Sequence, residues 1–274
     1  MTQSATYITT SWDDGHPLDL RIAALLSKHG LTGTFYVPMT AENGTMAAAQ
    51  IRDLHSAFEI GAHTIHHTVL TEVTDELAWQ EIVGSKAWLE DVTGRQCSMF
   101  CPPTGAFLRS HLKMIRKAGF VGLRTVELGS LDLPRRRAGL ALMPTTVQAY
   151  PHGLAAFARN AVKRMAFANL WRFLVHGRSA DWSQLARSLL NKAIERGGVF
   201  HLWGHSWELR DSSQWRRLDD VLRLMRDVAG DAPNLTNAEL ARISSTSGLH
   251  DDAMRDRRAD MGGSSDELRS DARG

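Results

Sequence analysis

Short apolar stretches alternate with amphipathic ones along most of the chain. The short stretches are rich in β-branched and aromatic residues, which predicts strands at residues 6–12, 34–37, 58–62, 98–101, 121–125 and 199–203. Apolar residues that recur every three or four positions predict helices at residues 18–29, 46–57, 74–92, 109–118, 182–196, 214–228 and from 236. Repeated strand–helix alternation with short connections predicts an α/β fold, with a parallel sheet closed or nearly closed into a barrel.

Several of these helices carry their own start and stop signals. Thr74 can cap the third helix, and Gly30 and Gly94 follow the ends of the first and third. Thr236 and Glu239 have the spacing of a capping box, in which hydroxyl and carboxylate bind each other's backbone N–H groups. These signals strengthen the assignment of the helices.

The length permits one large domain or two ordinary ones, and α/β barrels commonly fill this size as one. We expect a single domain over residues 1–243. From Ser244 onward the chain is rich in Ser, Gly, Asp and Arg and has almost no large apolar residues, so residues 244–274 are expected to form a disordered tail. Residues 134–137, Pro-Arg-Arg-Arg, are expected to form an exposed loop, either a solvated turn or a contact for an anionic substrate.

Composition narrows the class of protein. The 32 Lys and Arg residues exceed the 30 Asp and Glu residues by only two, too little to indicate a partner such as nucleic acid or a membrane surface. No apolar run approaches the roughly 18 residues that span a bilayer, and residues 1–6 show no secretory signal, so we expect a cytoplasmic protein. Cys97 and Cys101, the two cysteines, suit a reducing compartment.

Two adjacent carboxylates, Asp13 and Asp14, follow the first predicted strand. Successive side chains on a strand point in different directions, so one carboxylate can bind a metal while the other remains free as a base. Alternatively, the Asp-Asp-Gly sequence forms a turn whose carboxylates cap the next helix.

Histidines follow the third predicted strand. His63 and His67 are four residues apart, a spacing that on one helical turn places both imidazoles on one face and suits zinc-like ions. With one carboxylate they would form an open three-ligand site. The alternative is that they are solvated or core histidines.

The last predicted strand leads into a third polar cluster. It delivers His205 toward the same edge of the sheet, followed by Trp207 and Glu208. Aromatic rings such as those of Trp203 and Trp207, beside polar groups, suit a sugar ring, although they can equally be core residues. We interpret His201, inside the apolar strand, as structural.

These segments resemble the polysaccharide deacetylase family, the NodB-type fold of carbohydrate esterase family 4. Residues 11–15, Ser-Trp-Asp-Asp-Gly, resemble its first motif, Thr-Phe-Asp-Asp-Gly, and residues 63–67 match its second, His-Ser/Thr-x-x-His. Residues 100–105, Phe-Cys-Pro-Pro-Thr-Gly, resemble its third, Arg-x-Pro-Tyr-Gly, and His205 stands where the final strand supplies a catalytic histidine. The resemblance covers about residues 5–240.

The resemblance implies a distorted (β/α) barrel and a single catalytic domain that hydrolyses an N-acyl amide on a sugar. Asp14, His63 and His67 would hold a divalent metal, most often Zn²⁺ in this family. Asp13 would deprotonate the attacking water, and His205 would protonate the leaving amine.

The substrate cleft would lie around these residues. A backbone N–H near Thr104 would help the metal to stabilise the oxyanion. The candidate substrate-binding residues are His16, Pro103, Thr104, Trp203, Trp207 and Glu208.

Two departures from the family pattern concern the groups that support catalysis. Cys101 replaces the arginine of the third motif, which pairs with the catalytic aspartate in the family, and it cannot form an ion pair with Asp13. We expect Arg124 to substitute for it; otherwise the base is less constrained. The fourth motif, an Asp-Trp that steadies the catalytic histidine, has only a weak match at Asp181-Trp182.

Three functions therefore stand as hypotheses. The first is removal of an acetyl or formyl group from a small or oligomeric amino sugar in surface-polysaccharide or glycan-precursor metabolism. The second keeps the fold and metal but acts on a non-sugar amide or cyclic imide. The third is a catalytically inactive carbohydrate-binding relative. The sequence predicts no nucleic-acid partner and no membrane span, and it leaves the oligomeric state open.

Overall fold

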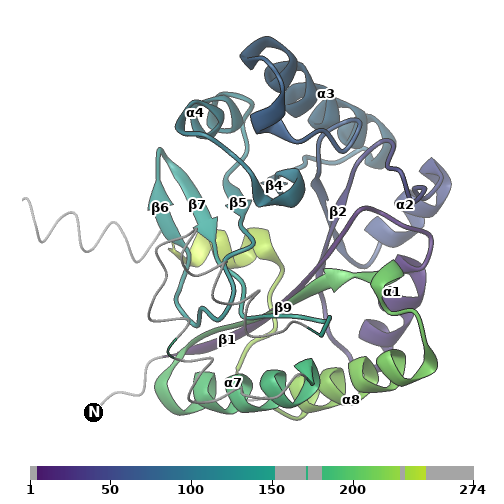
Figure 1. Cartoon of the computed structure of the whole chain (residues 1–274), viewed down its shortest axis with the longest axis vertical. Helices are drawn as coiled ribbons and strands as arrows, with labels where there is room; N and C mark the ends of the chain where they lie inside the picture. Colours follow the sequence, from purple (N-terminus) through teal and green to yellow (C-terminus); the bar gives the residue numbers. More distant parts are fainter. Residues whose placement is uncertain (1–4, 152–170, 172–180, 229–231, 245–274) are drawn as a thin grey trace, which may run out of the picture.

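The computed structural model describes residues 5–151, 171, 181–228 and 232–244. In this part of the chain, nine strands form one curled sheet with helices against it (Figure 1). The strands are β1 (Thr6–Asp13), β2 (Thr34–Val37), β3 (Glu59–Ala62), β4 (Met99–Phe100), β5 (Gly122–Arg124), β6 (Arg135–Arg137), β7 (Leu140–Met143), β8 (Val147–Gln148) and β9 (Gly198–His205). The helices are α1 (Asp19–Lys28), α2 (Ala48–His55), α3 (Asp75–Thr93), α4 (Arg109–Lys117), α7 (Trp182–Arg196) and α8 (Ser212–Val228). Short 3₁₀ helices are η1 (Leu70–Glu72), η2 (Pro103–Gly105) and η3 (Ser206–Glu208), and residues 237–244 are also helical.

The strand order is β6-β7-β5-β4-β3-β2-β1-β9-β8. Every neighbouring pair is parallel except β6 and β7. Helices cover the outside of the curled sheet (Figure 1), which explains why most strands, with the exception of β6, are buried along nearly their whole length instead of alternating between buried and exposed residues. The expected barrel-like α/β fold is therefore confirmed.

The longest strand pairing in the sheet is that of β1 and β9. The two strands align over their whole length, from Thr6 beside Gly198 to Asp13 beside His205. Ile8, Trp12 and Phe200 are fully buried in them. This register brings Asp13 and His205 to the same level at the carboxyl end of the sheet, where parallel α/β folds place their sites.

All six predicted strands and all seven predicted helices are present within a few residues of the predicted bounds. The Thr74 hydroxyl accepts from the Leu77 N–H, and Gly94 ends α3 with φ 67°. The Thr236 N–H donates to the Glu239 carboxylate at 2.8 Å, and the Glu239 N–H donates to the Thr236 hydroxyl at 3.3 Å. The predicted caps are therefore confirmed.

The exposed loop expected at residues 134–137 is wrong in part. Arg135–Arg137 form the edge strand β6, which pairs antiparallel with β7, although their side chains are exposed as expected. Ala138 and Gly139 make the turn, both with positive φ, the geometry of a two-residue hairpin. Because Ala rarely adopts it, the sequence did not indicate this hairpin.

The described helices include none that is both long and apolar enough to cross a membrane. Ser244, the first residue of the expected tail, is buried at the end of the helix over residues 237–244, while residues 245–274 lie outside the described part of the chain. The proposed single domain over residues 1–243 stays a prediction.

Candidate active site

Asp14, His63 and His67 converge at the carboxyl ends of β1 and β3. The Asp14 Oδ1 atom lies 3.4 Å from His63 Nε2 and 3.2 Å from His67 Nε2. One potential ligand atom from each residue lies within 4.8 Å of the other two. Asp14 and His63 are buried, and the side chain of His67 is partly open to solvent, so the three donors face one accessible point.

His63 and His67 come together through a loop, not through the helical turn that their spacing predicted. No helix is assigned over residues 63–67, and Thr64 and His67 adopt left-handed backbone with φ 63° and 54°. The carboxylate of Glu81, on α3, stabilises this loop. It accepts from the Ile65 N–H at 2.8 Å, the His66 N–H at 3.0 Å and the His66 ring at 2.7 Å.

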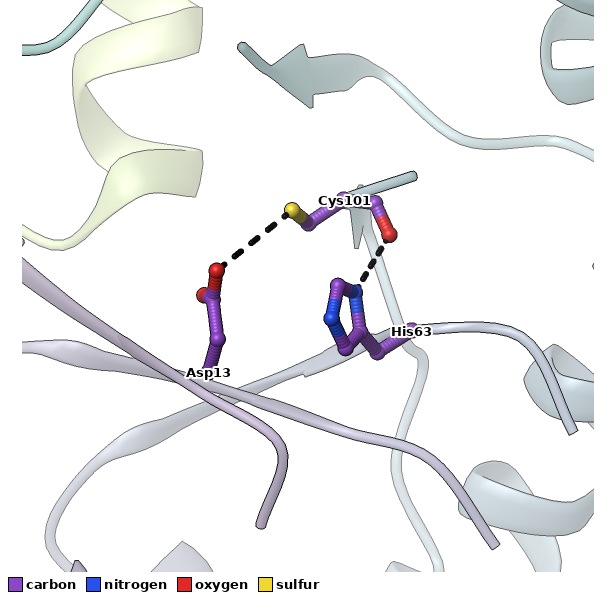
Figure 2. Close-up of side chains that lie close together, drawn as sticks. All are labelled: Asp13, His63 and Cys101. Carbon is purple, nitrogen blue, oxygen red and sulfur yellow. Dashed lines mark hydrogen bonds between the residues drawn. The ribbon is translucent and has the colours of Figure 1, made fainter. Parts of the chain in front are cut away.

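The orientation of His63 is fixed by the backbone of Cys101 (Figure 2). The His63 Nδ1–H donates to the Cys101 carbonyl oxygen at 2.6 Å. The proton therefore resides on Nδ1, and the Nε2 lone pair faces Asp14, which is the tautomer that a metal-ligating histidine needs.

Asp13, His63 and Cys101 form a second group with metal-ligand spacing. Figure 2 shows the Cys101 thiol directed at Asp13 and its carbonyl at His63. Burial raises the pKa of the Cys101 thiol well above its ordinary value, and Asp13 is already paired with Arg124. Asp14, His63 and His67 are the better ligand set.

The donor set fits a divalent cation of the zinc type. Within the described residues, Asp14 Oδ1 has no hydrogen-bond partner, and its near neighbours are the Nε2 atoms of His63 and His67. Because all three atoms direct lone pairs at the same point, a bound cation would stabilise the arrangement. Two imidazoles and one carboxylate are the ligand types of an open catalytic site.

Asp13 pairs with Arg124, the residue expected to replace the family's arginine. Arg124, on β5, donates from Nη2 to Asp13 Oδ2, and both side chains are buried. Burial alone would lower the pKa of Arg124, but the Asp13 charge raises it. The guanidinium carbon also lies 4.7 Å from the Trp203 ring centroid and 5.3 Å from that of Tyr36, contacts that hold the cation in place.

His205 lies beside Asp13 on the neighbouring strand, with its Nε2 atom 3.9 Å from Asp13 Oδ2. Its Nδ1–H donates to Glu208 Oε2 at 2.8 Å, and the same oxygen accepts from the Gln148 amide at 2.9 Å. Burial alone would lower the pKa of His205, but the contact with Glu208 and the charge of Asp13 raise it to about 9.

The two tryptophans occupy different positions around this centre. The Trp207 indole N–H donates to Asp14 Oδ2 at 2.9 Å, and the ring lies 5.3 Å from the His205 ring. Trp203 is 5% exposed, so it packs beneath the site against Arg124 and His205. Of the two, Trp207 has the ring that is partly exposed at the surface of the site.

The remaining expected cleft residues lie in the loops that follow β1 and β4. His16 is partly exposed, and its Nδ1 accepts from the Leu18 N–H at 3.1 Å. Pro103 is buried, whereas Thr104 is exposed with φ 56° in the turn that precedes α4.

The structure does not support Asp181-Trp182 as the partner of the catalytic histidine. Asp181 caps α7 by accepting from the Ser183 N–H at 3.0 Å, and the Trp182 indole donates to Gln214. Glu208 takes the position on His205 instead. Its spacing of three from His205 was visible in the sequence, but only the 3₁₀ turn of η3 shows that the two side chains meet.

His201 has the structural role predicted for it. The Ser11 hydroxyl donates to its Nε2 at 2.9 Å, and its Nδ1–H donates to the Pro144 carbonyl at 3.1 Å. Burial, with the charge of Arg124, lowers the pKa of His201 to about 3, so the ring is neutral.

Residues 1–123 match the family model described as polysaccharide deacetylase. The resemblance to the polysaccharide deacetylase family is confirmed. No curated protein matches the chain in sequence.

Solved polysaccharide deacetylases share the fold. A putative polysaccharide deacetylase from Mycobacterium smegmatis is 14% identical with a TM-score of 0.67, over 90% of this chain and 92% of that one. The peptidoglycan deacetylase PdaC from Bacillus subtilis is 14% identical with a TM-score of 0.53, over 93% and 98%. A pseudoenzyme of carbohydrate esterase family 4 from Bacillus anthracis is 16% identical with a TM-score of 0.50, over 88% and 66%. The fold is therefore shared by active and inactive proteins, and activity has to be argued from the site.

Proposed function

We propose that this protein is a metal-dependent hydrolase that removes an acetyl or formyl group from the nitrogen of an amino sugar. The observation that carries the proposal is the arrangement around Asp14, His63 and His67, with Asp13 and His205 beside them. The family match supports the same reaction class.

Asp14, His63 and His67 would hold the ion, and Zn²⁺ is the proposed metal because two imidazoles and a carboxylate suit it. When bound, the ion supplies Lewis acidity toward water and the amide carbonyl. Trp207 holds the second oxygen of Asp14, which leaves Oδ1 directed at the two histidines.

Asp13 is the proposed general base. Arg124 occupies its Oδ2 atom, while Oδ1 is buried and has no hydrogen-bond partner among the described residues. The pair thus orients the carboxylate and leaves one oxygen available to accept a proton from the attacking water.

His205 is the proposed general acid. An amine leaves readily only when protonated, so the reaction needs a donor that carries a proton at neutral pH. Glu208 stabilises the imidazolium from the Nδ1 side, and the raised pKa, about 9, keeps the ring protonated. Its Nε2–H is then the proton delivered to the leaving nitrogen.

The proposed substrate is an amino sugar of a surface polysaccharide or of a glycan precursor, and use of a precursor would place the enzyme in the cytoplasm. Trp207 offers a partly exposed ring next to the reacting groups, a surface that can stack against a sugar. His16 and Thr104, from the β1 and β4 loops, are the proposed contacts to its hydroxyl groups. Residues 1–243 are the proposed catalytic domain.

The test couples metal content to acyl release. The purified protein should contain about one zinc ion per chain and release acetate or formate from N-acyl amino sugars, with release abolished by a chelator. Asp14→Ala should lose both metal and turnover. Asp13→Asn and His205→Ala should keep the metal and lose turnover by about 10²–10⁴-fold, whereas Asp53→Asn, on the exposed face of α2, should change neither.

Other outcomes would assign a different function. Ring-opening hydrolysis of a cyclic imide or ureide, with no acyl release from any amino sugar, would establish the non-sugar amidase. Metal and tight sugar binding without any acyl release would establish a binding protein.

A further inference from the structure

Helix α4 lies beside the β6–β7 hairpin, at one edge of the sheet (Figure 1). A cavity of about 650 Å³ opens between these elements. Its cationic walls come from Arg109 and Lys113 on α4 and from Arg137 on β6, and Leu112 and Met114 contribute apolar surface. We call this cavity the α4–β6 pocket.

The three cations of the α4–β6 pocket have no counter-charge. Within the part of the chain that the structure describes, the side chains of Arg109, Lys113 and Arg137 form no ion pair or hydrogen bond, and all three residues are exposed. The other two arginines of β6 differ from Arg137 in this respect. Arg135 pairs with Glu127 at 2.7 Å, and Arg136 donates to the Gly139 carbonyl at 3.0 Å.

This concentration of positive charge is not a general property of the protein, whose net charge is only +2. The first turn of α4 contains no acidic side chain, so nothing on that helix neutralises Arg109. Like charges around one cavity repel each other, and the arrangement attracts anions instead.

We propose that the α4–β6 pocket binds the phosphate groups of a phosphorylated ligand. Two guanidinium groups and one ammonium match a ligand with two or three negative charges, because guanidinium forks bind phosphate oxygens in pairs. A single carboxylate would leave most of the positive charge unbalanced. The apolar walls suit the uncharged part of the ligand. The ligand is either a small molecule with a pyrophosphate group or a polyphosphate chain, since both present adjacent phosphates joined by an anhydride bond.

The proposal is independent of the hydrolytic reaction, because none of the pocket residues belongs to the site around Asp14. Its test uses the full-length protein and inorganic pyrophosphate, titrated by calorimetry at low and at physiological salt. Arg109→Gln, Lys113→Gln and Arg137→Gln should each weaken binding by about tenfold. The matched controls are Arg52→Gln and Arg187→Gln, which remove equally exposed arginines from α2 and α7 and should leave binding unchanged.

A second titration with inorganic polyphosphate distinguishes the two sources of phosphate. If pyrophosphate binds at the pocket with an affinity per phosphate similar to that of polyphosphate, the ligand is a small molecule. Pocket-dependent binding of polyphosphate alone would identify a polymer. Absence of binding to both, or equal weakening by the control variants, would overturn the proposal, because the cations would then act only through the overall charge.

Discussion

Glu81 has no place in the metal ligand set, yet its removal should weaken metal binding. Its carboxylate accepts three hydrogen bonds from the loop between His63 and His67, at 2.7–3.0 Å. Burial would raise the pKa of Glu81, but the contacts with His66 and Ile65 lower it, so the carboxylate is charged when it accepts them. The two ligands at the ends of the loop depend on this anchor for their position.

The size of the effect follows from the contacts. A hydrogen bond to a charged group contributes about 1.5–3 kcal/mol when buried, and less where water can replace the partner. The loop is partly exposed, so losing all three contacts in Glu81→Ala should cost about 2–4 kcal/mol of local stability. Residues that orient metal ligands typically contribute about 10–100-fold in metal affinity, and we expect a loss in this range.

The assay is competition for Zn²⁺ against a chromophoric chelator, with the unfolding temperature of the metal-free protein measured in parallel. Glu81→Gln should lose less affinity than Glu81→Ala, because its amide oxygen can still accept from the Ile65 and His66 N–H groups. Asp91→Ala removes an exposed acid from the same helix and should have no effect. A Glu81→Ala protein that is less stable but binds Zn²⁺ with unchanged affinity would refute the reasoning, since Glu81 would then support only the fold.

Two further predictions concern the groups that flank the ligands. Glu208→Gln should lower the pKa of His205 from about 9, so the alkaline limb of the pH–rate profile should shift to lower pH. In the wild-type protein, the His205–Glu208 pair contributes stability below about pH 6.5 and loses it as pH rises through about 9. The variant should lack this pH-dependent part of the free energy of unfolding. An unshifted profile would show that Glu208 does not tune the acid. Cys101→Arg, which restores the family's arginine, should destabilise the protein by about 3–5 kcal/mol because it buries a second cation beside Arg124. Adding Arg124→Ala should recover part of this loss in denaturant unfolding, because one cation then pairs with Asp13 again; an additive result would contradict the exchange.

The sequence predicted the elements well where one periodicity dominated. The strand β1 was assigned from its β-branched and aromatic residues, β9 from its apolar run, and α3 from its helical pattern and Thr cap. The strands β6, β7 and β8 were missed. They are only two to four residues long, and three arginines carry no apolar signal for an edge strand.

The candidate site could be predicted in its residues but not in its geometry. The spacing of His63 and His67 indicated that they act together, but the helical turn was wrong because the backbone reverses through left-handed residues. Arg124 was expected opposite Asp13 only because Cys101 replaces the family's arginine, so that the Asp13 carboxylate needed another cation. Glu81 contacts the loop from a helix that begins after it, and no local pattern links residues so placed.

Left-handed backbone is concentrated at the candidate metal site. Of the five non-glycine residues with positive φ among those described, Asp14, Thr64 and His67 belong to the two loops that carry the ligands. Such backbone costs about 1–2 kcal/mol for each residue other than glycine. These two loops therefore lower the free energy of unfolding that the core provides. A search for thermostable variants that ignored turnover would therefore favour replacements here, Thr64→Gly first among them, and would trade the ordered geometry of the ligands for stability.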